Sequence, residues 1–80
     1  MADHASDKLL IAFGAAVRRL RIVRGWSQED LADRVGIDRT YMGGVERGER
    51  NLGLRNVGRI ARALEVSPSV LLAEAERTDR

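Results

Sequence analysis

The stretch SQEDLADRVGIDRTYMGGVERG, residues 27–48, decides the fold of this 80-residue chain. Ser27 can cap a helix, and Asp30 stands three residues later, which is the spacing of a capping box. Apolar residues at helical spacing follow, and Gly36 can adopt the left-handed conformation that ends a helix in a tight turn. The stretch therefore predicts two short helices joined by a turn at Gly36.

The second of these helices should present a free N-terminus. Asp38 is its predicted N-cap and Gly48 follows its last turn. Arg39 and Thr40 then occupy the first turn, where the helix dipole does not favour an arginine. Arginine pairs with guanine, and threonine can donate a hydrogen bond or pack its methyl group on thymine. Arg39 and Thr40 are thus candidate base-reading residues of a helix that enters the major groove of DNA, and the alternative for Arg39 is a merely solvated side chain.

Gly43 and Gly44 lie one turn further along the same helix. Each costs about 1 kcal/mol relative to alanine inside a helix. One interpretation is close approach of the helix to DNA, which would make Gly44 a contact to the DNA backbone. The other is close packing against a second helix. On either interpretation, base reading depends on the preceding turn.

Several further residues are candidate contacts to the DNA backbone. Gln28 opens the first helix, beside free N–H groups and the positive end of a dipole that favour a phosphate. Arg47, Arg50 and Asn51 follow at the end of the second helix and in its loop, next to flanking phosphates. For each of them the alternative is an ordinary solvated surface. Trp26 precedes the capping serine, and this staple position predicts a core side chain instead of a base-stacking one.

The rest of the chain also has helical patterning. Phe13, Val17 and Leu20 mark one apolar stripe of a helix from about Asp7 to Arg24. A fourth amphipathic helix is indicated by Leu54, Val57, Ile60, Ala61 and Leu64. Ser67 and Pro68 form an N-cap and N1 pair for a last helix that runs to about Glu76. These patterns predict an all-α domain of about five helices over residues 8–76, preceded by a flexible tail, residues 1–7.

Composition limits the class of function. The chain has no cysteine, and its one histidine, His4, falls in the predicted tail. No thiolate metal site and no catalytic triad can be assembled, so we expect no enzyme activity, no metal and no cofactor. No signal peptide or long apolar run occurs, which favours a cytoplasmic protein.

Basic charge is concentrated around the two central helices. Residues 18–64 contain eleven arginines and six acidic residues, a net charge of +5, whereas the whole chain carries +2. Thirteen of the fourteen basic residues are arginine, which suits bidentate contacts to phosphate and guanine. Genomic codon bias is an equally simple reason for the arginine excess.

The run RRLRIVRGWSQEDLADRVGIDRTYMGGVERGERNLGL, residues 18–54, resembles the Cro/repressor-like (XRE) helix-turn-helix family. The likeness extends over about residues 13–72 and is greatest to the small controller proteins of restriction–modification systems. It implies a lambda-repressor-like fold, base reading by Arg39 and Thr40, and backbone contacts by Gln28, Tyr41, Arg50 and Asn51.

The resemblance also implies a buried ion pair between Arg21 and Glu46. The chain departs from the family pattern at two positions. Glu65 stands where glycine is common after the fourth helix, and Gly44 stands where relatives often have a base-reading side chain. Relatives of this size form two-fold dimers through their last helices. The residues expected to form this interface are Val66, Val70, Leu71 and Leu72.

The sequence thus favours a homodimeric regulator of transcription that binds double-stranded DNA at a near-palindromic operator, most like a controller of a restriction–modification operon. A phage-type or antitoxin-like repressor is the alternative within the same mechanism. A protein-interaction module without base readout is the alternative in a different class.

Overall fold

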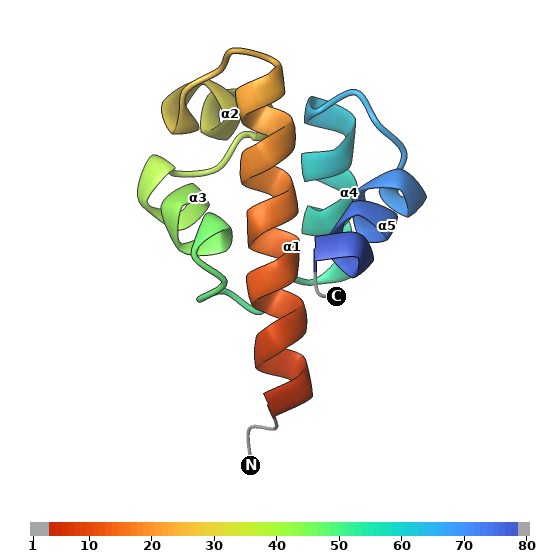
Figure 1. The fold of residues 1–80 in the computed structure, drawn as a ribbon. Helices are drawn as coiled ribbons and strands as arrows, with labels where there is room; N and C mark the ends of the chain where they lie inside the picture. The colour runs from red at the N-terminus through yellow and green to blue at the C-terminus, as the bar shows by residue number, and fades with distance from the viewer. Residues whose placement is uncertain (1–3, 79–80) are drawn as a thin grey trace.

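The computed structural model describes residues 4–78, and within them it contains five α-helices and no strand (Figure 1). The expectation of an all-α fold of about five helices is confirmed. The helix bounds are α1 (His4–Val23), α2 (Gln28–Val35), α3 (Arg39–Glu46), α4 (Leu54–Ala63) and α5 (Pro68–Thr78). No helix in this part of the chain is long and apolar enough to cross a membrane.

Helix α1 is the central element of the fold. It runs through the middle of the molecule, with α2 and α3 on one side and α4 and α5 on the other, and it packs against α3 and α5 (Figure 1). It begins at His4, earlier than the expected start near Asp7, so part of the predicted tail belongs to the helix. Residues 1–3 of that tail lie outside the described residues.

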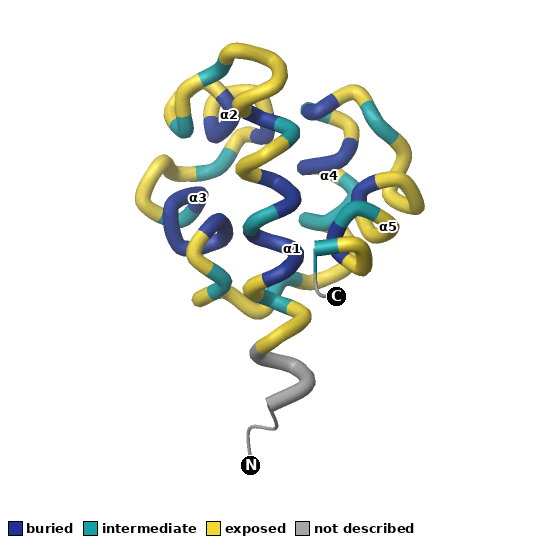
Figure 2. Tube along the Cα trace, viewed as in Figure 1, coloured by how far each residue is buried: buried dark blue, intermediate teal, exposed yellow. Residues whose placement is uncertain are grey.

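The core draws side chains from all five helices, as the dark blue segments in Figure 2 show. Its buried members are Phe13, Ala16, Val17, Leu31, Ala32, Val35, Met42, Val45, Ile60, Ala61, Leu64, Leu71 and Ala75. Trp26 packs against this cluster and stacks under the guanidinium of Arg34, whose Cζ lies 3.9 Å from the ring centroid. The prediction of a core position for Trp26 is therefore confirmed.

The apolar stripe of α4 is not buried along its whole length. Leu54 is 81% exposed, although its spacing places it on the apolar stripe of α4. It is the first residue of α4, so it lies at the end of the stripe that is furthest from the core residues Ile60 and Leu64, while Val57 between them is half-buried.

The predicted helix ends around α2 and α3 are confirmed. The Ser27 hydroxyl accepts from the N–H of Asp30, and the Asp30 carboxylate accepts from the N–H of Ser27, which completes the capping box and lowers the pKa of Asp30. Gly36 adopts a φ of 86°. Asp38 accepts from the N–H of Thr40 at 2.9 Å. These local contacts fix the angle between the two helices.

Two glycines bring α1 against the end of α3. A Cβ atom on Gly14 would overlap the carbonyl oxygen of Val45 and lie 2.6 Å from that of Glu46. A Cβ atom on Gly48 would lie 2.6 Å from Cα of Ile11. The backbones are therefore in direct contact at both positions, because neither residue has a side chain.

Glu65 replaces the usual glycine after α4 while keeping the glycine conformation. Its φ is 63°, in the left-handed region. Its N–H donates to the carbonyl of Arg62, and the next N–H, of Val66, donates to that of Ala61, which is the bonding pattern of a Schellman motif. The Arg24 guanidinium holds this end of α4 by donating to the Leu64 carbonyl and to the Glu65 carboxylate.

Glu65→Gly is expected to stabilise the fold by about 0.5–1 kcal/mol. A non-glycine residue pays about 1–2 kcal/mol in this conformation, and the half-exposed ion pair with Arg24 offsets at most a fraction of that cost. Urea unfolding measures the difference. Glu65→Gln keeps the backbone strain but removes the charge, so its free energy of unfolding should match that of the wild type. If Glu65→Gln were also stabilising, the gain in Glu65→Gly would come from loss of the charge and not from relief of strain.

Candidate nucleic-acid interface

The first turn of α3 is exposed. Arg39 and Thr40 are both exposed, whereas Met42, Val45 and Glu46 further along the helix are buried. The Arg39 side chain makes no hydrogen bond or ion pair with any other residue that the structure describes. Both side chains are thus available to an external partner, and their role in base reading stays a prediction.

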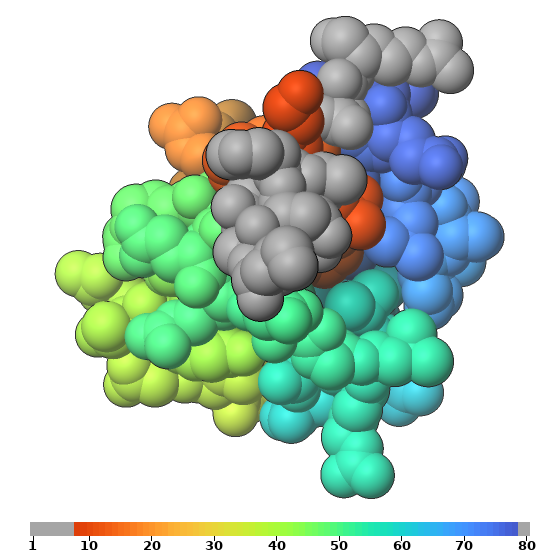
Figure 3. Space-filling model, turned by 90° about the horizontal axis from the view of Figure 1, so that it is seen from below, coloured from red at the N-terminus to blue at the C-terminus, as the bar shows by residue number. Residues whose placement is uncertain are grey.

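Helix α3 and the loop after it form one outer surface. Seen from below, the green atoms of this segment are continuous with the teal start of α4 (Figure 3). The loop residues Arg50 and Asn51 are exposed, and Tyr41 is half-buried. The Arg50 guanidinium stacks on the Tyr41 ring, with its Cζ 5.1 Å from the centroid. Candidate residues from the helix and from the loop therefore share this surface.

Arg47 is held differently from Arg50. Its Nε donates to the Glu49 carboxylate at 3.1 Å, and both side chains are largely exposed. This hydrogen bond lowers the pKa of the Glu49 carboxyl group. An exposed pair of this kind contributes little to stability, so Arg47 remains able to exchange its partner for a phosphate.

A buried ion pair ties α1 to α3, as the family resemblance implied. Arg21 Nε donates to Glu46 Oε2 at 2.7 Å, and Arg21 Nη2 donates to Glu46 Oε1 at 3.0 Å. The third nitrogen, Nη1, donates to the Trp26 carbonyl at 2.7 Å. The side chain of Glu46 is 1% exposed. The predicted pair is confirmed, and it extends to the turn before α2.

Gln28 belongs to the same network. Its Nε2 donates to Glu46 Oε1 at 3.0 Å, so the side chain that was predicted to contact a phosphate is oriented by the buried carboxylate. No local pattern indicates this contact, because it depends on how α2 crosses α3. A phosphate contact from the rest of the Gln28 side chain or from the start of α2 stays a prediction.

The room beside the two glycines of α3 is filled by side chains, not by a packed helix. A Cβ atom on Gly43 would lie 3.1 Å from Arg47 Nη1 and 3.5 Å from Gln28 Oε1. One on Gly44 would lie 2.9 Å from Arg50 Nε. The atoms nearest to both glycines are side-chain atoms, so the structure does not support a close approach of a second helix backbone here. Three of the predicted backbone-contact residues gather around these glycines instead.

One residue of the predicted dimer interface lies in the core. Leu71 is fully buried, because α5 packs on α1 through Leu71 and, one turn later, Ala75. Leu71 is therefore unavailable to a second chain. Val66 is half-buried, while Val70 and Leu72 are 46% and 40% exposed.

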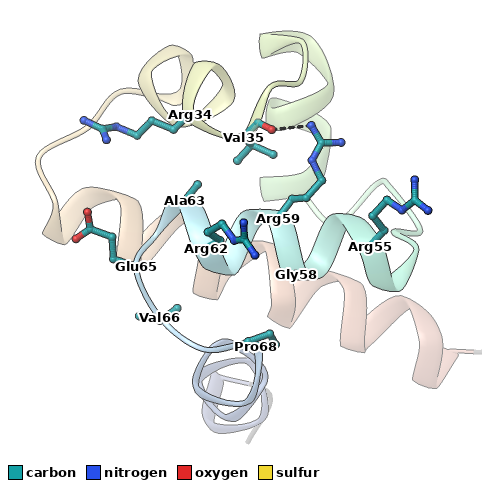
Figure 4. Close-up of a pocket in the computed structure, with 10 residues that line it drawn as sticks. All are labelled: Arg34, Val35, Arg55, Gly58, Arg59, Arg62, Ala63, Glu65, Val66 and Pro68. Atoms are coloured by element: carbon teal, nitrogen blue, oxygen red, sulfur yellow. Dashed lines mark hydrogen bonds between the residues drawn. The ribbon is translucent and has the colours of Figure 1, made fainter.

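A groove of about 1000 Å³ beside α4 is lined by four arginines but does not form a single anion site (Figure 4). Arg59 donates to the Val35 carbonyl at 2.8 Å and so caps the end of α2. Arg34 extends away from the groove, where it stacks on Trp26, and Arg55 and Arg62 point in other directions. Their guanidinium groups diverge, so no ligand could contact all four at once.

Comparison with known proteins places this geometry in a family. Residues 17–71 match the family model described as helix-turn-helix. Control protein C.BamHI of Bacillus amyloliquefaciens is 40% identical over 68 residues, which cover 84% of each chain. The crystal structure of the restriction–modification controller protein C.AhdI from Aeromonas hydrophila is 50% identical, covers 78% of this chain and 94% of its own, and superposes with a TM-score of 0.75.

A related controller protein has been solved on DNA. The C.Esp1396I tetramer in complex with its natural 35 base-pair operator is 35% identical and has a TM-score of 0.81, over 89% of this chain and 93% of that one. The chain therefore belongs to the helix-turn-helix family, and its relatives there include the controller proteins of restriction–modification systems.

Proposed function

We propose that this protein is a transcription regulator that binds a near-palindromic operator as a homodimer and controls a restriction–modification operon. The observation that carries the proposal is the exposed first turn of α3, where the side chains of Arg39 and Thr40 are accessible. The loop that contains Arg50 follows the same helix. The name of the operator-bound relative supports DNA as the ligand.

In this proposal Arg39 and Thr40 read base edges in the major groove, and Tyr41, Gly44, Arg50 and Asn51 hold the backbone on one side of them. Gln28, at the start of α2, and Arg47, just after the end of α3, both lie near Gly43 and hold the flanking phosphates. The division between base reading and backbone contact is the one that the resemblance to controller proteins implies.

The dimer would form through the apolar residues that α5 and its preceding loop leave accessible, namely Val66, Val70 and Leu72. A two-fold axis there would place the two α3 helices about 34 Å apart, one turn of DNA, and would make the operator a near-palindrome.

Selection of bound duplexes from a random pool tests the function. We expect one enriched near-palindrome, bound with an affinity that falls steeply as salt concentration rises. Absence of any enriched sequence, together with no duplex binding at low salt, would refute the proposal and favour a protein-interaction module. A palindrome that lies outside restriction and methyltransferase genes would favour a repressor of another operon.

Arg39→Ala is expected to cost about 1–3 kcal/mol of binding free energy at the selected site and little on random DNA. Arg50→Ala should weaken selected and random duplexes alike, because a phosphate contact carries no sequence information. Titrations of both variants on both duplexes measure the contrast. Equal losses on the two duplexes for both variants would contradict the assignment of Arg39 to base reading.

A further inference from the structure

Arg50 lies across the bare backbone of Gly44. A Cβ atom on Gly44 would come within 2.9 Å of Arg50 Nε, 3.1 Å of Cγ and 3.5 Å of Cδ. Several atoms along the length of the arginine, and not only its tip, occupy the space that any other residue would fill. An alanine methyl group could be accommodated only if the Arg50 side chain moved away.

The loop after α3 brings Arg50 into this position. Gly48 has a φ of 77°, and the N–H of Glu49 donates to the Gly44 carbonyl at 2.9 Å, so the chain turns back along the helix. Arg50 follows directly. Its position over Gly44 is therefore set by backbone geometry as well as by its own side chain.

The guanidinium of Arg50 also lies over an aromatic ring. Its Cζ lies 5.1 Å from the Tyr41 centroid, and Tyr41 and Gly44 are three residues apart on neighbouring turns of α3. A ring attracts a guanidinium at this distance. Arg50 thus lies against both the Gly44 backbone and the Tyr41 ring.

We infer that Gly44 is a positioning residue: its missing side chain forms a seat that holds Arg50 ready for the DNA backbone. This inference rests on the proposed function. An arginine on a free loop would lose its rotamer freedom on binding, and one that is already seated loses less. Gly44 thus positions Arg50 in the free protein, and this role does not require a contact between the helix backbone and DNA.

Gly44→Ala should therefore weaken duplex binding about two- to tenfold, the cost of immobilising one long side chain. It should not lower the melting temperature, because alanine is the better helix former. In an Arg50→Ala background the same change should have no further effect. Gly43→Ala needs only the tip of Arg47 to shift, so its loss should be smaller.

Gly58→Ala is the matched control, because Gly58 lies inside α4 with open space around its Cα. It should leave binding unchanged. If Gly44→Ala binds DNA like the wild type, the positioning role of Gly44 is refuted. The role is also refuted if the loss of affinity in Gly44→Ala adds fully to that in Arg50→Ala, because additivity would mean that the new methyl group contacts DNA directly.

A measurement without DNA separates this inference from the proposed function. The Arg50 Nε–H resonance should carry a ring-current shift from Tyr41 that Tyr41→Leu abolishes and Gly44→Ala reduces. An Arg50 resonance that Gly44→Ala leaves unmoved would overturn the seat even if the protein binds its operator. If Gly44→Ala shifts the Arg50 resonance but the protein binds no duplex, the positioning role of Gly44 stands and the proposed DNA-binding function is refuted.

Discussion

Glu46→Ala is expected to destabilise the domain by about 3–5 kcal/mol, the cost of leaving one partner of a buried ion pair without the other. The carboxylate accepts two hydrogen bonds from Arg21 and one from Gln28, and its side chain is 1% exposed. A domain of this size has a total stability of about 4–12 kcal/mol, so the variant should be largely unfolded or marginally stable. Urea unfolding followed by helical circular dichroism measures the loss.

Two controls locate the origin of the effect. Glu49→Ala removes an exposed acidic partner of Arg47 and should cost less than about 1 kcal/mol. Arg21→Met combined with Glu46→Leu removes both buried charges and should be more stable than Glu46→Ala alone. A melting temperature unchanged in Glu46→Ala would show that the pair contributes nothing to the fold.

Gly14→Ala is expected to destabilise the domain by about 3 kcal/mol or more, at the upper end of the range for overpacked cores. The new methyl group would overlap the Val45 carbonyl oxygen and press on that of Glu46. These are backbone atoms, so α1 and α3 would have to separate, and the separation would also stretch the Arg21–Glu46 pair. The free energy of unfolding measures the cost.

Gly58→Ala is the control for Gly14→Ala. Both glycines lie inside helices, and the surroundings of Gly58 are open. Alanine there should stabilise the fold by up to about 1 kcal/mol, its helix propensity advantage over glycine. If the two variants had similar stabilities, the close approach of α1 and α3 at Gly14 would be refuted.

Much of the fold could be predicted because the signals are local. The capping box at Ser27, the turn at Gly36 and the cap at Asp38 depend on residues within a few positions of each other, and all three are present. Arg21 and Glu46 are 25 residues apart, and only the resemblance to a family indicated their ion pair.

The errors and omissions concern how elements meet in space. Helical spacing identified the stripe that contains Leu54 but not where the core ends along it, and it did not show that α1 covers Leu71. Gly14 gave no signal among the alanines around it, because its importance comes from a helix that crosses it more than thirty residues later in the chain. The side chains over Gly43 and Gly44 were missed because their positions depend on the turn after α3 and on how α2 lies against α3.

The exposed first turn of α3 has an evolutionary consequence. Arg39 and Thr40 are exposed and are not members of the core, while the helix that carries them is anchored through Met42 and Glu46 in its later turns. Substitutions at 39 and 40 can therefore accumulate at little cost in stability. On the proposed base-reading role of these two residues, operator preference in a lineage of such proteins can diverge at two codons while the scaffold stays under selection.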